Sequence, residues 1–79
     1  MEIGKAFREL REEQNISRAE VARQIGCTQS AISKIERGKV LPKQSTIEAF
    51  CTILRIPLAR FYFCALTTDD FGSVDPIRY

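Results

Sequence analysis

Two short helical patterns in residues 17–39, joined by a tight turn that contains a glycine, constrain the fold of this chain more than any other feature. The first pattern opens with Ser17 and Glu20, at the spacing of a capping box that satisfies the free amides of a helix start. Gly26 follows where that helix must end, because glycine readily adopts the left-handed conformation that closes a helix. Thr28 then has the residue type of a second N-cap. The segment therefore predicts two helices joined by a tight turn. The apolar positions of the first helix are Ala19, Val21, Ala22 and Ile25.

The second of these helices carries polar residues along the face that its apolar positions leave exposed. Ala31, Ile32 and Ile35 would form its buried side, and Gly38 would end it. A pair of helices with such a turn and such a polar second helix forms a helix-turn-helix, which places its second helix in the major groove of DNA. The pattern therefore predicts a DNA-binding function together with a docking geometry.

Three further apolar stripes at helical spacing predict helices before and after this motif. They comprise Ile3, Ala6, Phe7 and Leu10; Ile47, Phe50, Cys51 and Leu54; and Leu58, Phe61, Tyr62, Ala65 and Leu66. The expected fold is thus all-α, a compact five-helix bundle.

The ends of these outer helices also have sequence signals. Asn15 is expected to end the first helix, and Ser45 with Glu48 forms a second capping box that would open the fourth. Pro57 suits the first turn of the fifth helix. The periodicity is lost after Thr67, so we expect a domain over residues 1–66 and a tail over residues 67–79.

Charge is distributed unevenly in a chain of 79 residues, which suffices for one small domain. The formal net charge is only +2. From Ser17 to Lys43, however, six basic residues face two acidic ones, which leaves a local charge of +4. From Ile56 onward two basic residues face three acidic ones, which leaves −1. A local basic patch of this kind is the expected footprint of a phosphate-binding face.

Several function classes are not supported by the residues present. The chain has three cysteines, no histidine and no CxxC pair, so we expect neither a disulfide framework nor a metal site. Cys27 and Cys51 are expected in the core, and Cys64 is expected to be partly exposed. The paired carboxylates Glu12–Glu13 and Asp69–Asp70 lie in solvated segments, and no glycine-rich phosphate loop is present. We therefore expect no enzyme activity and no cofactor.

Membrane and targeting signals are also missing from the sequence. It has no apolar run of membrane-spanning length, and its start, MEIGKAFREL, lacks the apolar core of a signal peptide. We expect a cytoplasmic protein that does not contact a membrane.

The ordered set of these features resembles the phage repressor and Cro-like family of helix-turn-helix proteins, also called the Xre type. The resemblance extends from about Ile3 to about Phe63. It rests on the REL-RE end of the first helix, the S-x-x-E-x-A start of the second, Gly26, the I-S-K-I-E-R-G segment and Pro42. It implies a lambda-repressor-like DNA-binding domain made of five helices.

The resemblance also implies which side chains meet DNA, with residues 29–37 as the recognition helix. The family's base-contacting positions match Thr28, Gln29, Ser30, Ser33 and Lys34, and its phosphate-contacting positions match Arg18, Arg37, Lys39 and Lys43. The amide of Gln29 suits adenine N6 and N7, and Lys34 suits guanine O6 and N7 or a phosphate. The alternative is that these are ordinary solvated residues on an exposed helix and a generic basic surface.

Other family positions have a structural meaning or depart from the common pattern. Those that match Arg11 and Glu36 form a partly buried ion pair in the family, which we interpret as structural. Arg18 stands where glutamine is common, and Gln44 stands where an apolar residue is common. Arg55 stands where glycine is common after the fourth helix, so that turn is expected to be slightly strained.

The fifth helix offers a face for a two-fold contact. Three consecutive aromatic residues, 61–63, cannot all point into one core, because consecutive residues lie about 100° apart on a helix. The expected inward residues are Leu58 and Phe61, and the expected homodimer contact comprises Tyr62, Phe63 and Leu66. The alternative is a tail that folds back, with Phe71 and Tyr79 covering these rings.

The leading hypothesis is a sequence-specific transcriptional regulator, a repressor or controller protein that acts as a homodimer on palindromic double-stranded DNA. Half-sites of such an operator lie about 34 Å apart. No small-molecule effector is implied, since the chain has no room for a separate sensor domain. The alternative is a protein-interaction module or an antitoxin-like subunit with the same fold. The basic residues Arg37, Lys39 and Lys43 discriminate between the two, because an interaction module need not keep them together.

Overall fold

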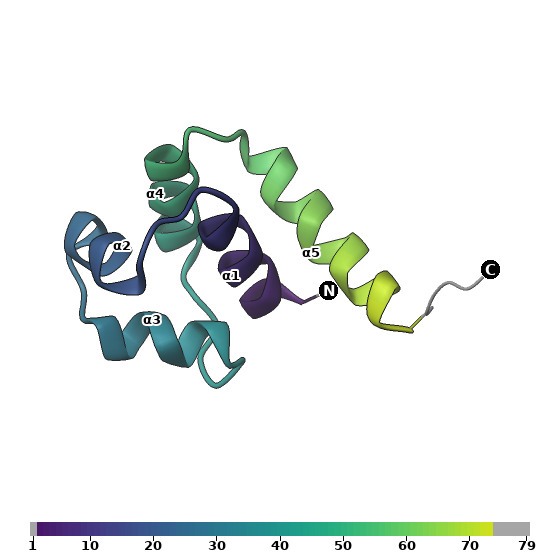
Figure 1. The fold of residues 1–79 in the computed structure, drawn as a ribbon, viewed down its shortest axis with the longest axis horizontal. Helices are drawn as coiled ribbons and strands as arrows, with labels where there is room; N and C mark the ends of the chain where they lie inside the picture. Colours follow the sequence, from purple (N-terminus) through teal and green to yellow (C-terminus); the bar gives the residue numbers. More distant parts are fainter. Residues whose placement is uncertain (1, 74–79) are drawn as a thin grey trace.

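The computed structural model describes the backbone of residues 2–73 and the side chains of residues 2–67. This part of the chain is entirely helical apart from its turns. The five helices are α1 (Ile3–Glu13), α2 (Arg18–Ile25), α3 (Gln29–Glu36), α4 (Gln44–Leu54) and α5 (Leu58–Ser73). Figure 1 shows α1 in the middle of the bundle, where it packs against both α3 and α5. The expected all-α bundle of five helices is confirmed.

Three phenylalanine rings form the centre of the core. Phe7 of α1, Phe50 of α4 and Phe61 of α5 are fully buried. The rings of Phe7 and Phe50 stack with their centroids 3.8 Å apart, and Phe61 meets both edge-on at 6.3 and 6.0 Å. Such mixed geometry is favourable for aromatic quadrupoles. The remaining buried apolar side chains are Ala6, Leu10, Val21, Ala22, Ile32, Ile35, Ile47, Cys51, Leu54 and Ala65.

The two helices of the central motif begin and end where the sequence predicts. The hydroxyl of Ser17 accepts a 3.0 Å hydrogen bond from the amide of Glu20, and the hydroxyl of Thr28 accepts one of 3.0 Å from the amide of Ala31. Gly26 closes α2 at a left-handed φ of +94°. The carboxylate of Glu20, however, accepts hydrogen bonds from Arg23 and Gln24. Of the two bonds of the predicted capping box, the described residues therefore show only the one that the Ser17 hydroxyl accepts.

The start of α4 differs from the prediction. The helix begins at Gln44 with Lys43 as its N-cap, so Ser45 lies inside the first turn. The carbonyl of Lys43 already accepts a helical bond of 3.0 Å from the amide of Ile47. The side chain of Gln44 donates 3.3 Å to the Glu48 carboxylate within the helix, and its oxygen accepts a hydrogen bond of 2.9 Å from the Tyr62 hydroxyl of α5.

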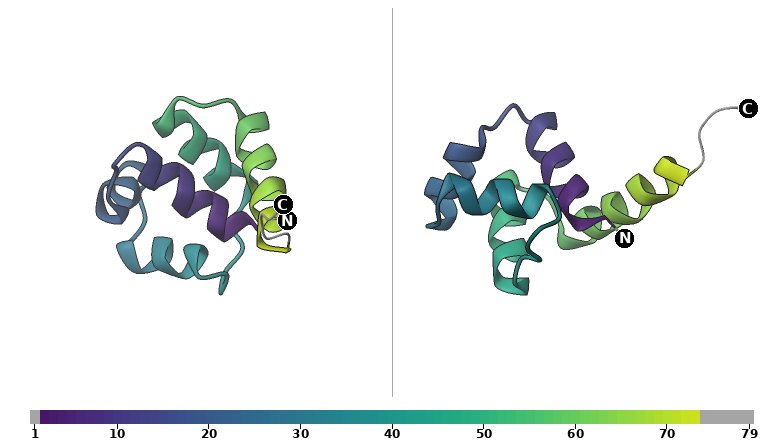
Figure 2. Two further views of the ribbon diagram at one scale, coloured as in Figure 1. Left: turned by 45° about the vertical axis from the view of Figure 1, so that its right-hand side comes forward. Right: turned by 90° about the horizontal axis from the view of Figure 1, so that it is seen from below.

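The end of α5 also differs from the prediction, because the helix continues to Ser73. Thr67 continues the helix instead of ending it, and its hydroxyl donates 3.0 Å to the carbonyl of Phe63. Apolar residues recur at helical spacing where one face of a helix packs on the core. Where a helix extends beyond its neighbours it has no such buried face, so its sequence need not show this spacing. Figure 2 shows the last turns of α5 projecting from the bundle. The suggested cover by Phe71 and Tyr79 lies outside the described side chains.

Two expected core positions are wrong. Cys27 is exposed, whereas Cys51 is buried and Cys64 is half-buried as expected. Cys27 follows Gly26 in the turn between α2 and α3, where the chain runs along the surface. Ala19 is also exposed, because it lies in the first turn of α2 on the side away from the core.

Helices α4 and α5 meet at a sharp bend. Arg55 ends α4 in the left-handed region, with φ +58° and ψ +44°, which confirms the expected strain at this position. In the described part of the chain, no single helix is long and apolar enough to cross a membrane. Helix α4 and residues 58–67 of α5 reach that length and composition only together, across a bend of 103°.

Candidate nucleic-acid interface

The position of α3 is set by contacts on two sides. Figure 2 shows α2 and α3 joined by the short turn that follows Gly26, and the two helices pack against each other. On the other side, α1 approaches the carboxyl end of α3 very closely at Gly4. A Cβ atom at Gly4 would lie 2.5 Å from the carbonyl oxygen of Ile35 and 2.9 Å from that of Glu36. Sequence reasoning missed Gly4, although a glycine within the first turn of an amphipathic helix is a signal of close approach.

The side chains expected to meet bases lie on the outer surface of α3 and at its start. Thr28, Gln29, Ser30 and Lys34 are exposed, and Ser33 is half-buried. The buried side of the helix is formed by Ile32, Ile35 and Glu36. The structure therefore leaves four of these five polar side chains open to a ligand and the fifth, Ser33, partly covered.

The residues expected to contact phosphates fall into two groups. Arg37, Lys39 and Lys43 are exposed in the segment between α3 and α4. Within the described residues, no ion pair engages any of these three side chains. Their charges are therefore available to an anionic partner beside α3.

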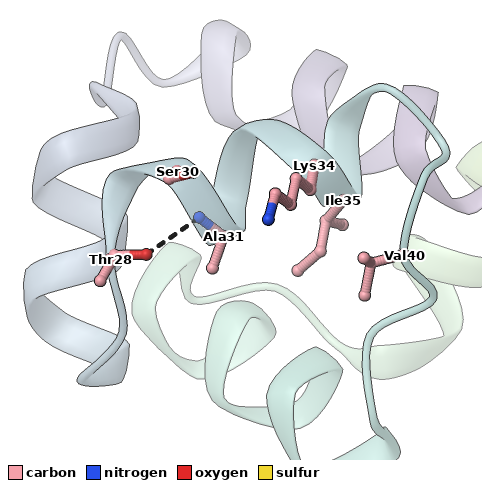
Figure 3. Close-up of a pocket in the computed structure, with 6 residues that line it drawn as sticks. All are labelled: Thr28, Ser30, Ala31, Lys34, Ile35 and Val40. Carbon is pink, nitrogen blue, oxygen red and sulfur yellow. Dashed lines mark hydrogen bonds between the residues drawn. The ribbon is translucent and has the colours of Figure 1, made fainter.

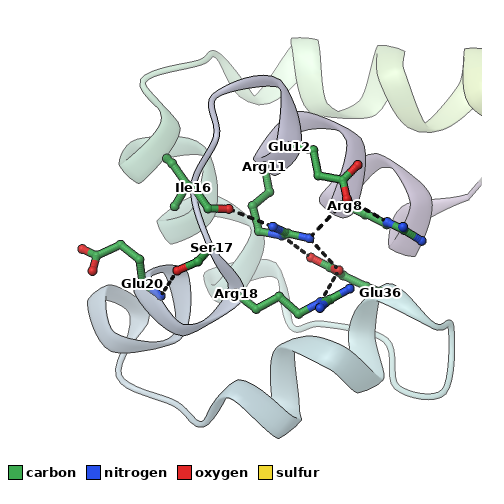
Figure 4. A network of polar contacts seen from close by, with 8 residues as sticks. All are labelled: Arg8, Arg11, Glu12, Ile16, Ser17, Arg18, Glu20 and Glu36. Carbon is green, nitrogen blue, oxygen red and sulfur yellow. Dashed lines mark hydrogen bonds and ion pairs between the residues drawn. The ribbon is translucent and has the colours of Figure 1, made fainter.

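Arg18 has a partner inside the protein. Its Nε donates 2.9 Å to Oε1 of Glu36, while the Nε of Arg11 donates 2.7 Å to Oε2 of the same carboxylate (Figure 4). The Nη1 of Arg11 also donates 2.8 Å to the carbonyl of Ile16. The side chain of Glu36 is 2% exposed, that of Arg11 is 8% exposed and that of Arg18 is 38% exposed. Sequence reasoning missed the contact between Arg18 and Glu36.

Another arginine of α2 is held by its own helix. The hydrogen bond from Arg23, with a second from Gln24, holds the pKa of Glu20 below its usual range. The same interaction raises the pKa of Arg23. Arg23 is therefore engaged along α2, whereas the basic residues after α3 are not. Among the described residues, no group of three or more histidine, cysteine or acidic side chains could hold a metal ion.

The side chains expected in a two-fold contact do not share one environment. Tyr62 is half-buried, its hydroxyl donates to Gln44, and its ring meets that of Phe61 edge-on at 5.5 Å. Phe63 is 66% exposed and Leu66 is 52% exposed. These two residues are one turn apart on α5, so they form a small apolar patch on its outer side.

Comparisons with known proteins agree on one type of domain. A family model described as a helix-turn-helix domain matches residues 2–61. The HTH-type transcriptional regulator PuuR of Escherichia coli K12 is 37% identical over 59 residues, which are 75% of this chain and 32% of PuuR. PuuR of Shigella flexneri matches to the same extent. The chain thus spans about a third of the length of the curated relatives it matches.

Three solved structures have a similar fold. The clp gene regulator ClgR of Corynebacterium glutamicum superimposes with a TM-score of 0.85 at 20% identity, over 90% of this chain and 76% of ClgR. The restriction-modification controller protein C.AhdI of Aeromonas hydrophila gives 0.71 at 27% identity, over 76% of this chain and 91% of C.AhdI. SinR, a master regulator for biofilm formation solved in complex with DNA, gives 0.68 at 26% identity, over 76% and 97%.

Proposed function

Because the chain belongs to the family of helix-turn-helix domains, whose model matches residues 2–61, we propose that it is a sequence-specific, DNA-binding transcriptional regulator. Its resemblance to phage repressor and Cro-like proteins is confirmed by the comparisons. The observation that carries the proposal is the polar outer surface of α3, which lies beside unpaired basic residues in a fold that SinR uses in a DNA complex.

In this proposal α3 enters the major groove as the recognition helix. Gln29 reads adenine through its amide, and Lys34 donates to guanine or to a phosphate. The short side chains of Ser30 and Ser33 let the helix approach the base edges closely. The hydroxyl oxygen of Thr28 accepts the N-cap bond from the amide of Ala31, which positions the start of the helix, and its O–H can still donate to DNA.

The basic residues hold the protein on the duplex without reading its sequence. Arg37, Lys39 and Lys43 follow α3 directly, where the helix leaves the groove and the chain meets the phosphates. Arg18 contacts a phosphate through its terminal nitrogens, because its Nε is held by Glu36 while its side chain stays 38% exposed. These contacts supply affinity that depends strongly on salt.

A homodimer on a palindromic operator completes the proposal. One helix of eight residues reads only a few base pairs, so two copies are needed for a specific site. The exposed pair Phe63 and Leu66 offers the contact, and Tyr62 supports it from the half-buried side of α5. Helix α5 lies across α1 from α3, so pairing through α5 leaves both recognition helices free (Figure 1).

Selection of bound sequences from a random duplex pool, at near-physiological salt, tests the proposal. We expect enrichment of a palindrome whose half-sites are centred about ten base pairs apart. Lys34→Ala should relax the preference at one position of each half-site. An unenriched pool with only weak, salt-sensitive binding would contradict sequence reading and favour a protein-interaction module.

Salt dependence provides a second test with a matched control. Lys39→Ala should weaken binding to all sequences and reduce the slope of log affinity against log salt by about one. Arg55→Gln removes the same charge from the turn between α4 and α5, which lies on the opposite side of the bundle from α3 (Figure 1). That control should leave the slope unchanged.

A further inference from the structure

The start of α1 contacts two other helices within a few residues. The amide of Glu2 donates 3.1 Å to the carbonyl of Ala65 in α5. Two residues later, Gly4 lies against the carboxyl end of α3, where a Cβ atom would come within 2.5 Å of the carbonyl oxygen of Ile35. Ala65 directly precedes Leu66 of the exposed apolar patch on α5. This short segment therefore connects the recognition helix with the surface of the proposed two-fold contact.

The close approach at Gly4 is a contact between two backbones. The carbonyl oxygens that face it belong to the last turn of α3, and that of Ile35 also accepts a hydrogen bond of 3.0 Å from the amide of Gly38. Backbone atoms of a helix cannot rotate away from a new neighbour as the tip of a side chain can. The contact also brings the positive end of the α1 dipole to the negative end of the α3 dipole, which is favourable. The lack of a side chain at position 4 therefore sets how closely α3 lies against α1.

A displacement at the end of α3 would move the proposed reading side chains with it. Figure 3 shows Lys34 beside Ile35 on the same helix. Helix α2 would follow, because the Nε of Arg18, its first residue, is bonded to Glu36, the last residue of α3. The helix-turn-helix is therefore expected to move as one unit relative to α1 and α5.

We propose that Gly4 is a positioning residue, which sets the distance between the recognition helix and the patch of Phe63 and Leu66 on α5, and thereby the half-site spacing that the dimer accepts. The inference rests on the proposed function, because it requires two copies that pair through α5 on a palindrome. Its specific claim is that a change at position 4 alters the spacing between half-sites more than the reading of one half-site.

The size of the expected displacement follows from the contact distance. A Cβ atom reaches ordinary contact with an oxygen at about 3.4 Å, so an alanine at position 4 would push the Ile35 carbonyl back by about 0.9 Å. The two-fold axis repeats this displacement in the second copy, which gives up to about 2 Å between the two recognition helices. One base-pair step is about 3.4 Å, so a change of this size alters the fit to a given spacing.

A set of duplexes with different half-site spacings tests the inference. Each duplex carries two copies of the selected half-site, with centres about nine to twelve base pairs apart, and one further duplex carries a single half-site. The wild-type protein should prefer one spacing. In Gly4→Ala the ratio of the affinities for the preferred and the adjacent spacings should change by at least about threefold, while the affinity for a single half-site should change by less than about twofold.

The ratio of affinities separates positioning from a loss of stability. A variant that only folds less well loses the same fraction of active protein on every duplex, so its ratio would equal that of the wild type. Lys5→Ala is the matched control, because it places an alanine at the next position of the same turn, where the side chain is exposed. It should leave the ratio unchanged.

Thermal unfolding gives an independent sign for the contact. At a helix position without close neighbours alanine would raise the Tm, because it is a better helix former than glycine. The contact with α3 predicts a lower Tm for Gly4→Ala. If this variant is unfolded at the assay temperature, the spacing series is measured in Gly4→Ala with Arg55→Gly, which relieves the strained turn after α4, with Arg55→Gly alone as the reference.

The outcomes separate this inference from the function on which it rests. If the wild-type protein binds no selected palindrome, or binds every spacing equally, pairing on a palindrome fails and the inference fails with it. If the wild type prefers one spacing and Gly4→Ala keeps the same ratio, only the inference is overturned. A higher Tm for Gly4→Ala would also overturn it, as would a double variant that does not fold, because the contact would then serve the fold as a whole.

Discussion

Arg18 donates from its Nε to Oε1 of Glu36 across 2.9 Å, and so links the first residue of α2 to the last residue of α3. Arg11 of α1 bonds the same carboxylate through Nε and Nη2, at 2.7 and 3.2 Å. One carboxylate thus joins the three helices that form and support the recognition surface. A carboxylate that is 2% exposed requires such compensation, since an unpaired buried charge is strongly unfavourable.

Replacement of Glu36 by glutamine should destabilise the fold. The substitution keeps the size of the side chain but leaves Arg11, which is 8% exposed, with only a longer contact of 3.8 Å to the carboxylate of Glu12. Removal of one partner from a buried pair costs about 3–5 kcal/mol, so we expect a loss of that order in the free energy of unfolding. Urea denaturation followed by circular dichroism measures it. Glu48→Gln, at an exposed position of α4, should change the same quantity by less than about 0.5 kcal/mol.

Replacement of Arg18 by glutamine should affect DNA binding more than stability. Glu36 keeps Arg11 as its partner, and Arg18 is 38% exposed, so the loss of stability should be clearly smaller than for Glu36→Gln. If the terminal nitrogens of Arg18 contact a phosphate, the salt slope of binding should fall by about one. Filter binding at several salt concentrations gives this slope. A weaker affinity with an unchanged slope would show that Arg18 acts only by positioning α3 through Glu36.

The difference between what the sequence predicted and what it missed follows from the range of the interactions. The caps at Ser17 and Thr28 and the left-handed Gly26 arise from bonds within a few residues, so their spacing in the sequence is informative. At the start of α4, the side chain of Gln44 bonds Glu48 within the helix and also the hydroxyl of Tyr62, which is 18 residues away. A local pattern contains no trace of that contact, and it favoured Ser45 as the cap.

At the candidate interface, too, some features follow from local spacing in the sequence and others depend on contacts between distant segments. Polar residues on the outer surface of α3 follow from the apolar positions that must face the core, and the structure leaves them exposed or, at Ser33, half-buried. The contact of Arg18 with Glu36 and the close approach of Gly4 to α3 both need the relative positions of separate segments. A basic residue is also ambiguous in sequence, because a phosphate and a buried carboxylate would each favour arginine at position 18.

Replacement of Arg55 by glycine should stabilise the protein. Arg55 is exposed and occupies the left-handed region at φ +58°, a conformation that costs an ordinary L-residue about 1–2 kcal/mol. Glycine removes this strain but loses more chain entropy on folding, so the expected net gain is about 0.5–1 kcal/mol. Thermal unfolding should detect it. Asn15→Gly is the matched comparison at the same φ of +58°, and its gain should be smaller because asparagine tolerates this region.

The apolar patch on α5 gives the last prediction, which concerns assembly. If Phe63 and Leu66 form the two-fold contact, the variant Phe63→Ser with Leu66→Ser should remain folded, because both side chains are more than half exposed in the single chain. Sedimentation equilibrium should show the wild-type protein as a dimer and this variant as a monomer at the same concentration. Its affinity for a full palindrome should fall to that for one half-site, because the two recognition helices no longer bind as a unit.

Two controls make the dimer prediction specific. Leu41→Ser removes an even more exposed apolar side chain, at 80%, from the segment between α3 and α4, and it should leave the dimer intact. Tyr62→Phe removes only the hydroxyl that binds Gln44, so it tests whether the α4–α5 contact is needed to present the patch. A wild-type protein that sediments as a monomer at high micromolar concentration would contradict pairing through α5. Unchanged sedimentation of the double variant would place the two-fold contact on another surface.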